Sequence, residues 1–283
     1  MRVLVTGAGG QLGRDVTLTC EAAGDEVLAA DHAALDVTSR DAVLGAVTML
    51  RPHAVVHCAA WTAVDACEAD PDRAWLANAL AVRYVADACR RADAHLVHVS
   101  TDYVFSGTKP TPYTEWDPPD PLSTYGRSKL GGEHEALSAG IGATVVRTSW
   151  VCGEFGANMV KTILRLAGEQ PELAFVDDQI GHPSFCADLA PVLRRLAIDR
   201  RSGVYHVTNQ GAVSWYEFAR AVVEASGRDP DMVRPIKTAD MQPPRPAPRP
   251  ANSVLDNVAL RLGDLPMLRD FHEPLAELVA RIT

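Results

Sequence analysis

At 283 residues the chain can hold one large domain or one and a half, and its 47% hydrophobic and 22% charged residues exclude a mainly disordered protein. The formal net charge of −9 argues against a general nucleic-acid-binding protein, although local donors can still hold a small anionic ligand. No apolar run approaches the roughly 18 residues of a membrane span, so we expect no membrane association.

The first segment combines a short β-branched run with regularly spaced glycines. Residues 2–6 predict a strand, and Gly7, Gly10 and Gly13 follow with the spacing G-x-x-G-x-x-G, ahead of a helix to about residue 23. Such a turn lets backbone N–H groups approach a pyrophosphate at the amino end of the helix. The glycine pattern alone is equally compatible with a plain strand-to-helix turn.

A second strand, at residues 26–30, ends in Asp31. This is where a dinucleotide-binding fold places a carboxylate on the adenosine ribose, and an acid there disfavours a 2′-phosphate and favours NADH over NADPH. Asp36 and Val37 follow a few residues later. They are interpreted either as lying along the adenine or as the start of the next helix.

The next segments repeat the alternation of strand and helix. Helices are expected at residues 39–50, 71–92 and 125–139, and strands at residues 54–58, 95–99 and 143–147. Asp70 is expected to cap the helix that begins at Pro71. Because the strands are apolar almost throughout, they predict a parallel sheet covered on both faces, as in a Rossmann-like, doubly wound α/β fold.

Ligands of doubly wound folds bind outside the carboxyl ends of the strands. Small or polar residues follow these ends, among them Ala59-Ala60, Ser100-Thr101-Asp102 and Ser149-Trp150. The two alanines leave room for a cofactor beside the third strand, although alanines can also simply end a strand.

Beyond residue 150 the alternation becomes less regular. Helices are expected at residues 158–168, 188–198, 214–226 and 273–282, strands at 173–176 and 204–208, and an extended proline-rich arm at 243–250. We therefore expect a dinucleotide-binding domain at residues 1–150, to which about 185–210 return. Residues 151–184 and 211–283 are expected to form a smaller α+β substrate-binding lobe.

Tyr125 and Lys129 stand four residues apart at the start of a predicted helix, so they face the same way. Six tyrosines and four lysines in the chain predict roughly 0.08 pairs with this spacing by chance. A phenol beside an ammonium, close to Thr101 at the end of the fourth strand, is suited to proton transfer.

Together these motifs resemble the extended short-chain dehydrogenase/reductases, and within them the dTDP-4-dehydrorhamnose reductase family. The glycine turn and the Tyr125/Lys129 pair are common to the whole superfamily. More specific matches to the narrower family lie at residues 58–65, 100–105, 125–133, 147–151, 178–183 and 249–253.

The resemblance implies a reduction by NADPH or NADH of the C4 keto group of a nucleotide-linked deoxysugar, most closely dTDP-4-dehydro-L-rhamnose. Tyr125 would protonate the oxygen, Lys129 would lower the pKa of the phenol and bind the nicotinamide ribose, and Thr101 would donate a hydrogen bond to the carbonyl. The implied cofactor contacts are Gly7, Gly10, Gln11, Leu12, Gly13, Asp31, Asp36, Val37, Ala59, Ala60, Tyr125 and Lys129.

The implied substrate contacts are Thr101, Asp102, Trp150, Asn158 and Arg249. Each also has a structural interpretation: a hydroxyl or acid at the end of a strand, a core tryptophan, or a solvated arginine. Arg245 and Arg249 lie on the proline-rich arm, where guanidinium groups would suit a diphosphate. Met159 stands where the family commonly has an aromatic residue, which leaves the shape of the sugar pocket open.

Neither the histidines nor the cysteines form a metal-binding pattern. The nine histidines are scattered, and the six cysteines include no C-x-x-C pair, so we expect no metal site and reduced, mostly buried thiols. The start of the chain lacks the apolar core of a signal peptide, which favours a cytoplasmic protein. The sequence leaves a homodimer open.

Two alternatives remain from the sequence. One is another 4-ketoreductase, or an epimerase or dehydratase with trapped NAD. Dehydratases of the superfamily usually have an acid pair after the threonine, whereas here Tyr103 follows Asp102. The other is a non-catalytic subunit resembling the regulatory subunit of methionine adenosyltransferase, against which the intact Thr101, Tyr125 and Lys129 argue.

Overall fold

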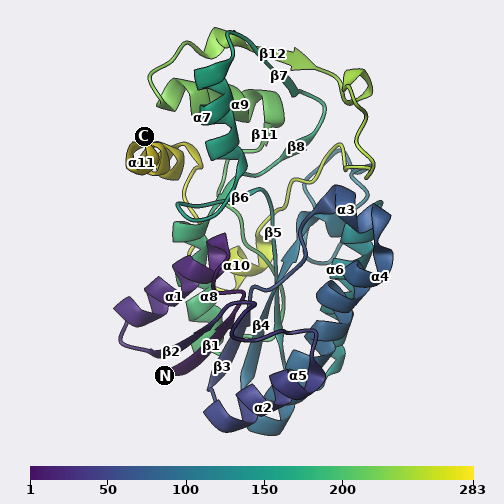
Figure 1. Ribbon diagram of the computed structural model, residues 1–283, viewed down its shortest axis with the longest axis vertical. Helices are drawn as coiled ribbons and strands as arrows, with labels where there is room; N and C mark the ends of the chain where they lie inside the picture. Colours follow the sequence, from purple (N-terminus) through teal and green to yellow (C-terminus); the bar gives the residue numbers. More distant parts are fainter.

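A six-stranded parallel sheet with the order β10-β5-β4-β3-β1-β2 forms the centre of the computed structural model, which describes residues 1–283 (Figure 1). The strands are β1 (Arg2–Thr6), β2 (Glu26–Ala30), β3 (Ala54–His57), β4 (His95–Thr101), β5 (Thr144–Thr148) and β10 (Gly203–His206). Nearly every residue of β1, β3, β4 and β5 is buried, because helices cover both faces of the sheet. The predicted doubly wound fold is confirmed.

Two hydrophobic cores lie on opposite faces of this sheet. Val3 and Val5 of β1 contribute to one core and Leu4 to the other, since successive strand residues point to opposite faces. The first core is covered by α1 (Gln11–Ala22) and α8 (Cys186–Ile198). The second is covered by α2 (Arg40–Leu50), α5 (Ala81–Ala92) and α6 (Thr124–Ser138), on the other side of the sheet in Figure 1.

The helix expected at residues 71–92 consists of several pieces. They are α4 (Pro71–Trp75), the π-helical turn η1 (Leu76–Leu80) and α5, which follow one another without a gap; the short helix α3 (Val64–Ala69) precedes them. Asp70 caps α4 by accepting a hydrogen bond from the Arg73 amide. Within the π turn, the buried Asn78 side chain hydrogen-bonds to the backbone of Trp61 and to Ser128, which ties the turn to α6.

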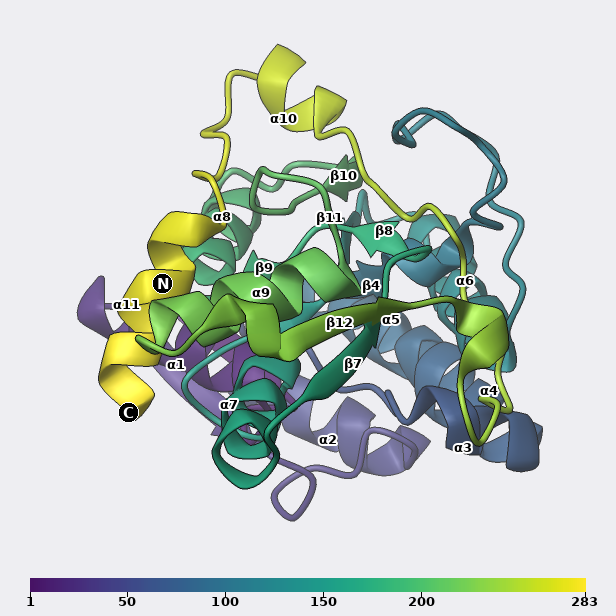
Figure 2. The same cartoon turned by 90° about the horizontal axis from the view of Figure 1, so that it is seen from above.

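A second lobe stands above the carboxyl ends of the strands. It contains α7 (Met159–Glu169), β7 (Leu173–Val176), α9 (Trp215–Ala225), β12 (Val233–Ile236) and α11 (His272–Ile282). Phe218 and Phe271 lie at the centre of its own core. In Figure 2, β7 and β12 run side by side, in agreement with their parallel pairing.

Short elements connect the two parts. They are β6 (Val151–Cys152) paired with β9 (Ser184–Phe185), β8 (Ile180–Gly181) paired with β11 (Val213–Ser214), and the 3-10 turn η2 (Asp102–Val104). Two further 3-10 turns, η3 (Pro230–Met232) and η4 (Thr238–Asp240), flank β12 in the second lobe. The last crossing is made by α10 (Val258–Leu262), which packs beside β10 and places Leu260 in the core of the first domain (Figure 2). The C-terminal segment thus contributes to both parts.

None of the helices combines the length and the apolar character that a membrane span requires.

Candidate active site

Three connected cavities lie between the carboxyl ends of the strands and the second lobe. The first, of about 770 Å³, extends from the glycine turn to Asp31, and the second, of about 410 Å³, contains Thr101 and Tyr125. The third, of about 660 Å³, reaches Phe175 and the proline-rich arm. The first two cavities share Gly7, Gly10, Cys58 and Ala60. The last two share Thr62, Val64, Tyr103 and Trp215.

The glycine turn can hold a pyrophosphate for steric reasons. Gly7 has a φ of +67°, and a Cβ at this position would lie 2.7 Å from the Ala59 amide nitrogen. A Cβ on Gly13 would overlap the Gly7 carbonyl. Helix α1 begins at Gln11 without a side-chain cap, so its first N–H groups face the groove.

The far end of the first cavity fits an adenosine. Asp31 is exposed there and accepts a hydrogen bond from the Ala34 amide at 2.9 Å. Asp36 accepts hydrogen bonds from the hydroxyl and the amide of Thr38, which lower the pKa of its carboxyl group. Val37 and Ala59 line the same cavity. The predicted cofactor residues thus lie along one groove. The first cavity is lined by Gly7, Gly10, Asp31, Asp36, Val37, Ala59 and Ala60, and the adjoining second cavity by Gln11, Leu12 and Gly13.

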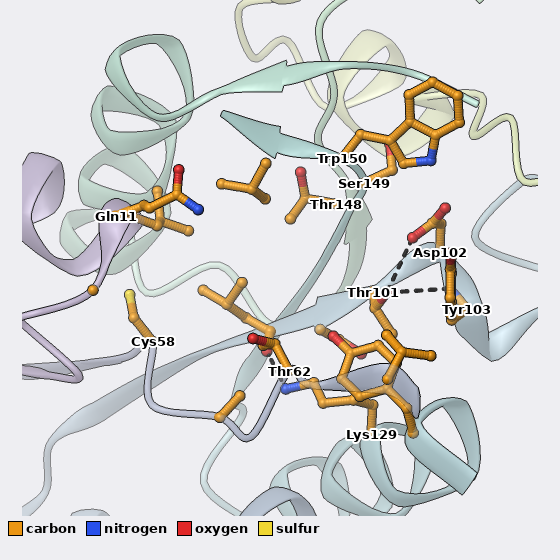
Figure 3. Close-up of a pocket in the computed structure, with 18 of the residues that line it drawn as sticks. Gln11, Cys58, Thr62, Thr101, Asp102, Tyr103, Lys129, Thr148, Ser149 and Trp150 are labelled. Atoms are coloured by element: carbon orange, nitrogen blue, oxygen red, sulfur yellow. Dashed lines mark hydrogen bonds between the residues drawn. The ribbon is translucent and has the colours of Figure 1, made fainter. Parts of the chain in front are cut away.

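Thr101, Tyr125 and Lys129 line the second cavity from two elements, β4 and α6 (Figure 3). The start of α6 lies so close to η2 that a Cβ on Gly126 would overlap the Tyr103 carbonyl, which fixes the position of Tyr125. The Lys129 ammonium donates a hydrogen bond to the Val99 carbonyl at 2.7 Å. All three side chains are buried, so the reactive groups would be screened from bulk water.

The protonation states differ from the sequence-based expectation. Burial raises the pKa of Tyr125, and the nearby Asp102 carboxylate raises it further. Burial lowers the pKa of Lys129 to about 8. The Lys129 ammonium, held by the Val99 carbonyl, does not offset the effect of burial, so the pKa of the phenol stays above its ordinary value. Tyr125 therefore carries its proton at neutral pH and is a proton donor in this arrangement.

Asp102 is the one predicted substrate contact with an unpartnered buried atom. Its side chain is 2% exposed, and Oδ1 accepts a hydrogen bond from the Thr101 hydroxyl at 3.0 Å. Oδ2 has no partner. Burial raises the pKa of this carboxyl group to about 6. Asp102 lines the second cavity, while Oδ2 itself is buried and the Ser253 hydroxyl lies close to this carboxyl group.

Trp150 lines the second cavity and also packs against another tryptophan, Trp215. Its backbone has a φ of +43°, which is unusual for a bulky residue. The indole stacks on Trp215 with ring centroids 3.6 Å apart, and a Cβ on Gly181 would collide with it at 2.8 Å. Figure 3 shows Trp150 beside Asp102, with Gln11 and Cys58 on the opposite side of the cavity.

Asn158 is not brought into the cavity. Its amide donates hydrogen bonds to Gln11 at 2.9 Å and to the Gly153 carbonyl at 2.7 Å, and its oxygen caps α7 by accepting from the Lys161 amide. With these bonds the side chain joins α7 to α1. The next residue, Met159, lines the third cavity instead.

Arg249 and Arg245 both line the third cavity, but their side chains differ in exposure and in how firmly Asp65 holds them. Arg249 is 14% exposed and donates two hydrogen bonds to Asp65, at 2.9 and 2.8 Å. Arg245 is 55% exposed and only reaches the same carboxylate at 3.4 Å. Arg249 therefore anchors the arm to α3, whereas Arg245 is free to turn toward a ligand.

The sequence did not identify several residues of the cavities. Tyr103 stands between the second and third cavities, and its ring meets that of Tyr125 edge to face at 5.9 Å. It belongs to the family-specific stretch at residues 100–105, so that stretch was a usable signal. Trp215 and Phe175 come from distant elements of the lobe, and no local pattern marks them.

The family model and similar known proteins point to the same family. The family model described as the RmlD substrate binding domain matches residues 1–283. A dTDP-4-dehydrorhamnose reductase from Aggregatibacter actinomycetemcomitans is 42% identical, with 90% of each chain covered. A probable dTDP-4,6-dihydroxy-2-methyloxan-3-one 4-ketoreductase from Streptomyces antibioticus is 43% identical, with 98% of this chain and 94% of the relative covered.

A solved structure extends the same comparison. The dTDP-4-dehydrorhamnose reductase from Bacillus anthracis in complex with NADP is 37% identical and superposes with a TM-score of 0.95, with 99% of both chains covered.

Proposed function

Because the chain belongs to the family of the RmlD substrate binding domain, which includes dTDP-4-dehydrorhamnose reductases, we propose that it reduces dTDP-4-dehydro-L-rhamnose to dTDP-L-rhamnose with NADPH or NADH. The observation that carries this proposal is that Thr101, Tyr125 and Lys129 line one cavity, which continues into the groove of the glycine turn. This arrangement also favours an enzyme over a non-catalytic regulatory subunit.

A nicotinamide cofactor held along the groove by Gly7, Gly10 and Asp31 would supply a hydride for the C4 carbon of the sugar. Tyr125 is protonated at neutral pH, so its hydroxyl can donate a proton to the C4 oxygen as negative charge develops there. Lys129, one helical turn away, then stabilises the resulting phenolate until solvent returns a proton. Reduction starts from the protonated phenol, which is the form that Tyr125 has at neutral pH.

Thr101 supplies a hydrogen bond to the same oxygen. In the structure its hydroxyl donates to Asp102, so contact with the substrate requires rotation about the Cβ–Oγ bond. This rotation would free Oδ1 of Asp102 to accept a hydrogen bond from a sugar hydroxyl group. Once turned toward the substrate, this hydroxyl stabilises the negative charge that develops on the C4 oxygen in the transition state.

The third cavity would hold the nucleotide and the diphosphate. Phe175 offers a ring for stacking on a base, and the exposed Arg245 offers a guanidinium for the phosphates. Trp150 would cover the sugar where the second and third cavities meet.

A different 4-keto sugar is the second candidate substrate. The 4-ketoreductase from Streptomyces antibioticus is as similar to this chain as the rhamnose-forming relative is. Met159, in the third cavity, is smaller and more flexible than the aromatic residue common in the family, so it can admit a sugar nucleotide of different shape.

The test is to supply purified protein with dTDP-4-dehydro-6-deoxy-L-mannose, or with the dehydratase and epimerase that form it, and to follow NADPH and NADH oxidation. The C4 configuration of the product distinguishes the two candidates. If neither cofactor is oxidised with this sugar or with dTDP-4-keto-6-deoxy-D-glucose, the proposal is wrong.

A further inference from the structure

A buried carboxylate lies one turn beyond Lys129 on the same face of α6. Glu133 is 1% exposed, and three donor atoms from two side chains of other elements converge on it. The Ser100 hydroxyl donates to Oε1 at 2.6 Å, and Arg147 donates to Oε1 from Nε at 2.9 Å and to Oε2 from Nη2 at 2.7 Å. Both carboxylate oxygens are therefore held.

The elements joined at Glu133 are the ones that carry the reactive side chains. Helix α6 carries Tyr125 and Lys129, and in β4 Ser100 immediately precedes Thr101. Strand β5 contains Arg147 and leads directly to Trp150. A displacement of the Glu133 carboxylate would therefore change the distance between the proton donor and the hydroxyl that faces the same substrate oxygen.

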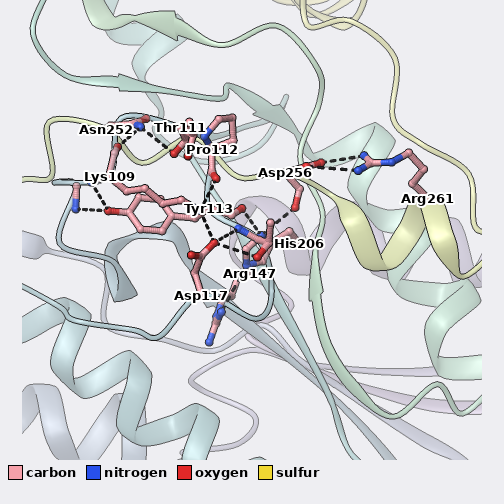
Figure 4. Close-up of polar contacts among 12 residues, drawn as sticks. Lys109, Thr111, Pro112, Tyr113, Asp117, Arg147, His206, Asn252, Asp256 and Arg261 are labelled. Atoms are coloured by element: carbon pink, nitrogen blue, oxygen red, sulfur yellow. Dashed lines mark hydrogen bonds and ion pairs between the residues drawn. The ribbon is translucent and has the colours of Figure 1, made fainter.

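The position of the Arg147 side chain is in turn fixed by a contact with His206. Its Nη1 lies 3.4 Å from Nε2 of His206, whose Nδ1 lies 3.1 Å from the carbonyl oxygens of Tyr113 and Asp256 (Figure 4). Since carbonyl oxygens only accept, Nδ1 carries the hydrogen and Nε2 accepts from Arg147. Burial lowers the pKa of His206 to about 3, so this imidazole is neutral.

Glu133 and Arg147 thus form a buried, hydrogen-bonded ion pair. Through His206 this pair links α6 to the backbone of Asp256. Buried ion pairs contribute little net stability compared with apolar residues of the same size. Stability is therefore a weak reason for this pair to be built into the site.

Glu133 is also the charged group that faces Lys129. Three titratable groups face the ammonium: His57 at the end of β3, Cys58 directly after it, and His98 in β4. Burial lowers the pKa of both imidazoles far below neutrality and raises that of the Cys58 thiol to about 12, so all three groups are neutral. Burial lowers the pKa of Lys129, and the negative charge of Glu133 opposes this effect.

We propose that Glu133, held by Arg147 and Ser100, is a positioning residue of the reduction: it sets α6 against β4 and keeps Lys129 charged beside Tyr125. The proposal rests on the proposed function for its kinetic part. Its electrostatic part concerns the free protein and can be measured without substrate.

The first experiment titrates Lys129 directly. The chain has four lysines, Lys109, Lys129, Lys161 and Lys237. Labelling lysine with ¹³C at Cε therefore gives few NMR signals, and the variant Lys129→Met assigns the one of interest. In Glu133→Gln, which keeps the shape but not the charge, the titration midpoint of Lys129 should fall by roughly one pH unit. In Glu133→Asp, which keeps the charge, it should remain near that of the parent.

The second experiment measures turnover. Glu133→Gln should lower kcat by up to roughly 100-fold, with the KM for the sugar nucleotide nearly unchanged, because the reacting groups are displaced but the nucleotide cavity is not. The alkaline limb of its pH profile should move to lower pH. Glu133→Asp should lower kcat without moving that limb, since the carboxylate is withdrawn by one methylene but still charged.

The matched control is Glu135→Gln. Glu135 lies on the same helix and is also paired with an arginine, Arg83, but the pair is on the surface. This variant should keep the parent kcat and pH profile. A parent-like Lys129 midpoint and kcat in folded Glu133→Gln would overturn the proposal.

If Glu133→Gln does not fold, the positioning role is tested with the variants Glu133→Asp and Arg147→Lys instead. Arg147→Lys keeps the positive charge but loses the two-pronged hydrogen bonding. A reduced kcat with unchanged KM in both variants supports positioning, and parent kcat in both contradicts it. A parent protein without turnover would instead refute the proposed function, while the NMR titration would still test the electrostatic part.

Discussion

The hydroxyl of Tyr125 is buried within the cavity, and burial raises the pKa of the phenol, so a proton is held where the C4 oxygen of a sugar would bind. Replacing Tyr125 by Phe removes this proton and little volume. We expect Tyr125→Phe to lower kcat by roughly 10² to 10⁴ and to leave the Kd for NADPH almost unchanged. Stopped-flow turnover and cofactor titration measure the two quantities. An unchanged kcat would remove Tyr125 from the mechanism.

Asp102 gives a prediction for the dependence of stability on pH. Its pKa is about 6 in the folded protein and 3.8 as the ordinary value, so the folded state binds this proton more tightly and loses stability as pH rises from about 3.8 to 6. Asp102→Asn removes the penalty. We expect the variant to be more stable than the parent at pH 7.5, by up to about 3 kcal/mol, and to be less active.

The measurement is urea unfolding at pH 7.5 and at pH 4.5, where the difference between Asp102→Asn and the parent should largely disappear. Asp41→Asn serves as the control, because the Asp41 side chain is 96% exposed. A stability difference that does not change with pH would mean that the Asp102 carboxylate is not the cause.

Asp31 governs the choice of cofactor in our interpretation. It is exposed at the end of the first cavity, where the ribose of an adenosine would lie. We expect Asp31→Ala to weaken NADH binding more than NADPH binding, because the lost carboxylate accepts from the ribose hydroxyls but repels a 2′-phosphate. Fluorescence titration with each cofactor measures the ratio. Equal losses would show that the ribose does not contact Asp31.

At the scale of elements, the proline-rich arm is held to α3 by the hydrogen bonds between Arg249 and Asp65. A lysine cannot reproduce this two-pronged contact. We expect Arg249→Lys to raise the KM for the sugar nucleotide by roughly tenfold or more, since hydrogen bonds to charged groups contribute about 1.5–3 kcal/mol. The Kd for NADPH should stay unchanged, because the cofactor groove lies at the other end of the site.

Asp65→Asn separates two explanations for such a result. It weakens the anchor but leaves the Arg249 side chain in place. Equal increases in KM for both variants would indicate that the position of the arm matters, and an effect of Arg249→Lys alone would indicate direct contact with the ligand. A loss of thermal stability with unchanged KM would make the arm purely structural.

At the scale of the whole molecule, the cavities lie between a sheet domain and a lobe with separate cores. A ligand that contacts both parts should stabilise them together. We expect NADPH at a concentration of 100 times its Kd to add about 2.7 kcal/mol to the free energy of unfolding, and dTDP to add a further increment. Thermal unfolding with each ligand and with both measures this. ADP, a nucleoside diphosphate like dTDP, is the control and should add nothing beyond saturating NADPH.

The same division explains what the sequence could predict. The glycine turn and the pair Tyr125/Lys129 are local patterns, whose geometry follows from a single turn or one helix, and the parallel sheet follows from the alternation of apolar strands with helices. Asn158 was expected at the sugar but joins Gln11, 147 residues away in the chain. Such contacts between distant residues depend on how the lobe folds over the sheet.

Contacts between residues far apart in the sequence also account for the other differences between the sequence-based predictions and the structure. Arg249 finds Asp65 across 184 residues, and Trp215 reaches Trp150 from a helix of the lobe. The protonation of Tyr125 could not be predicted either, because it depends on burial and on where the Lys129 ammonium finds its hydrogen-bond acceptor. Local motifs predicted many of the residues that line the cavities, and the tertiary structure determines which hydrogen bonds each of them makes.

The stacked pair of Trp150 and Trp215 has a spectroscopic consequence. Two indoles with centroids 3.6 Å apart and planes 10° from parallel are close enough for their excited states to couple, and both line the cavity. A sugar nucleotide that separates or reorients them would change the near-ultraviolet circular dichroism and the emission of the protein. The molecule therefore carries an intrinsic optical reporter of substrate binding that needs neither a label nor turnover.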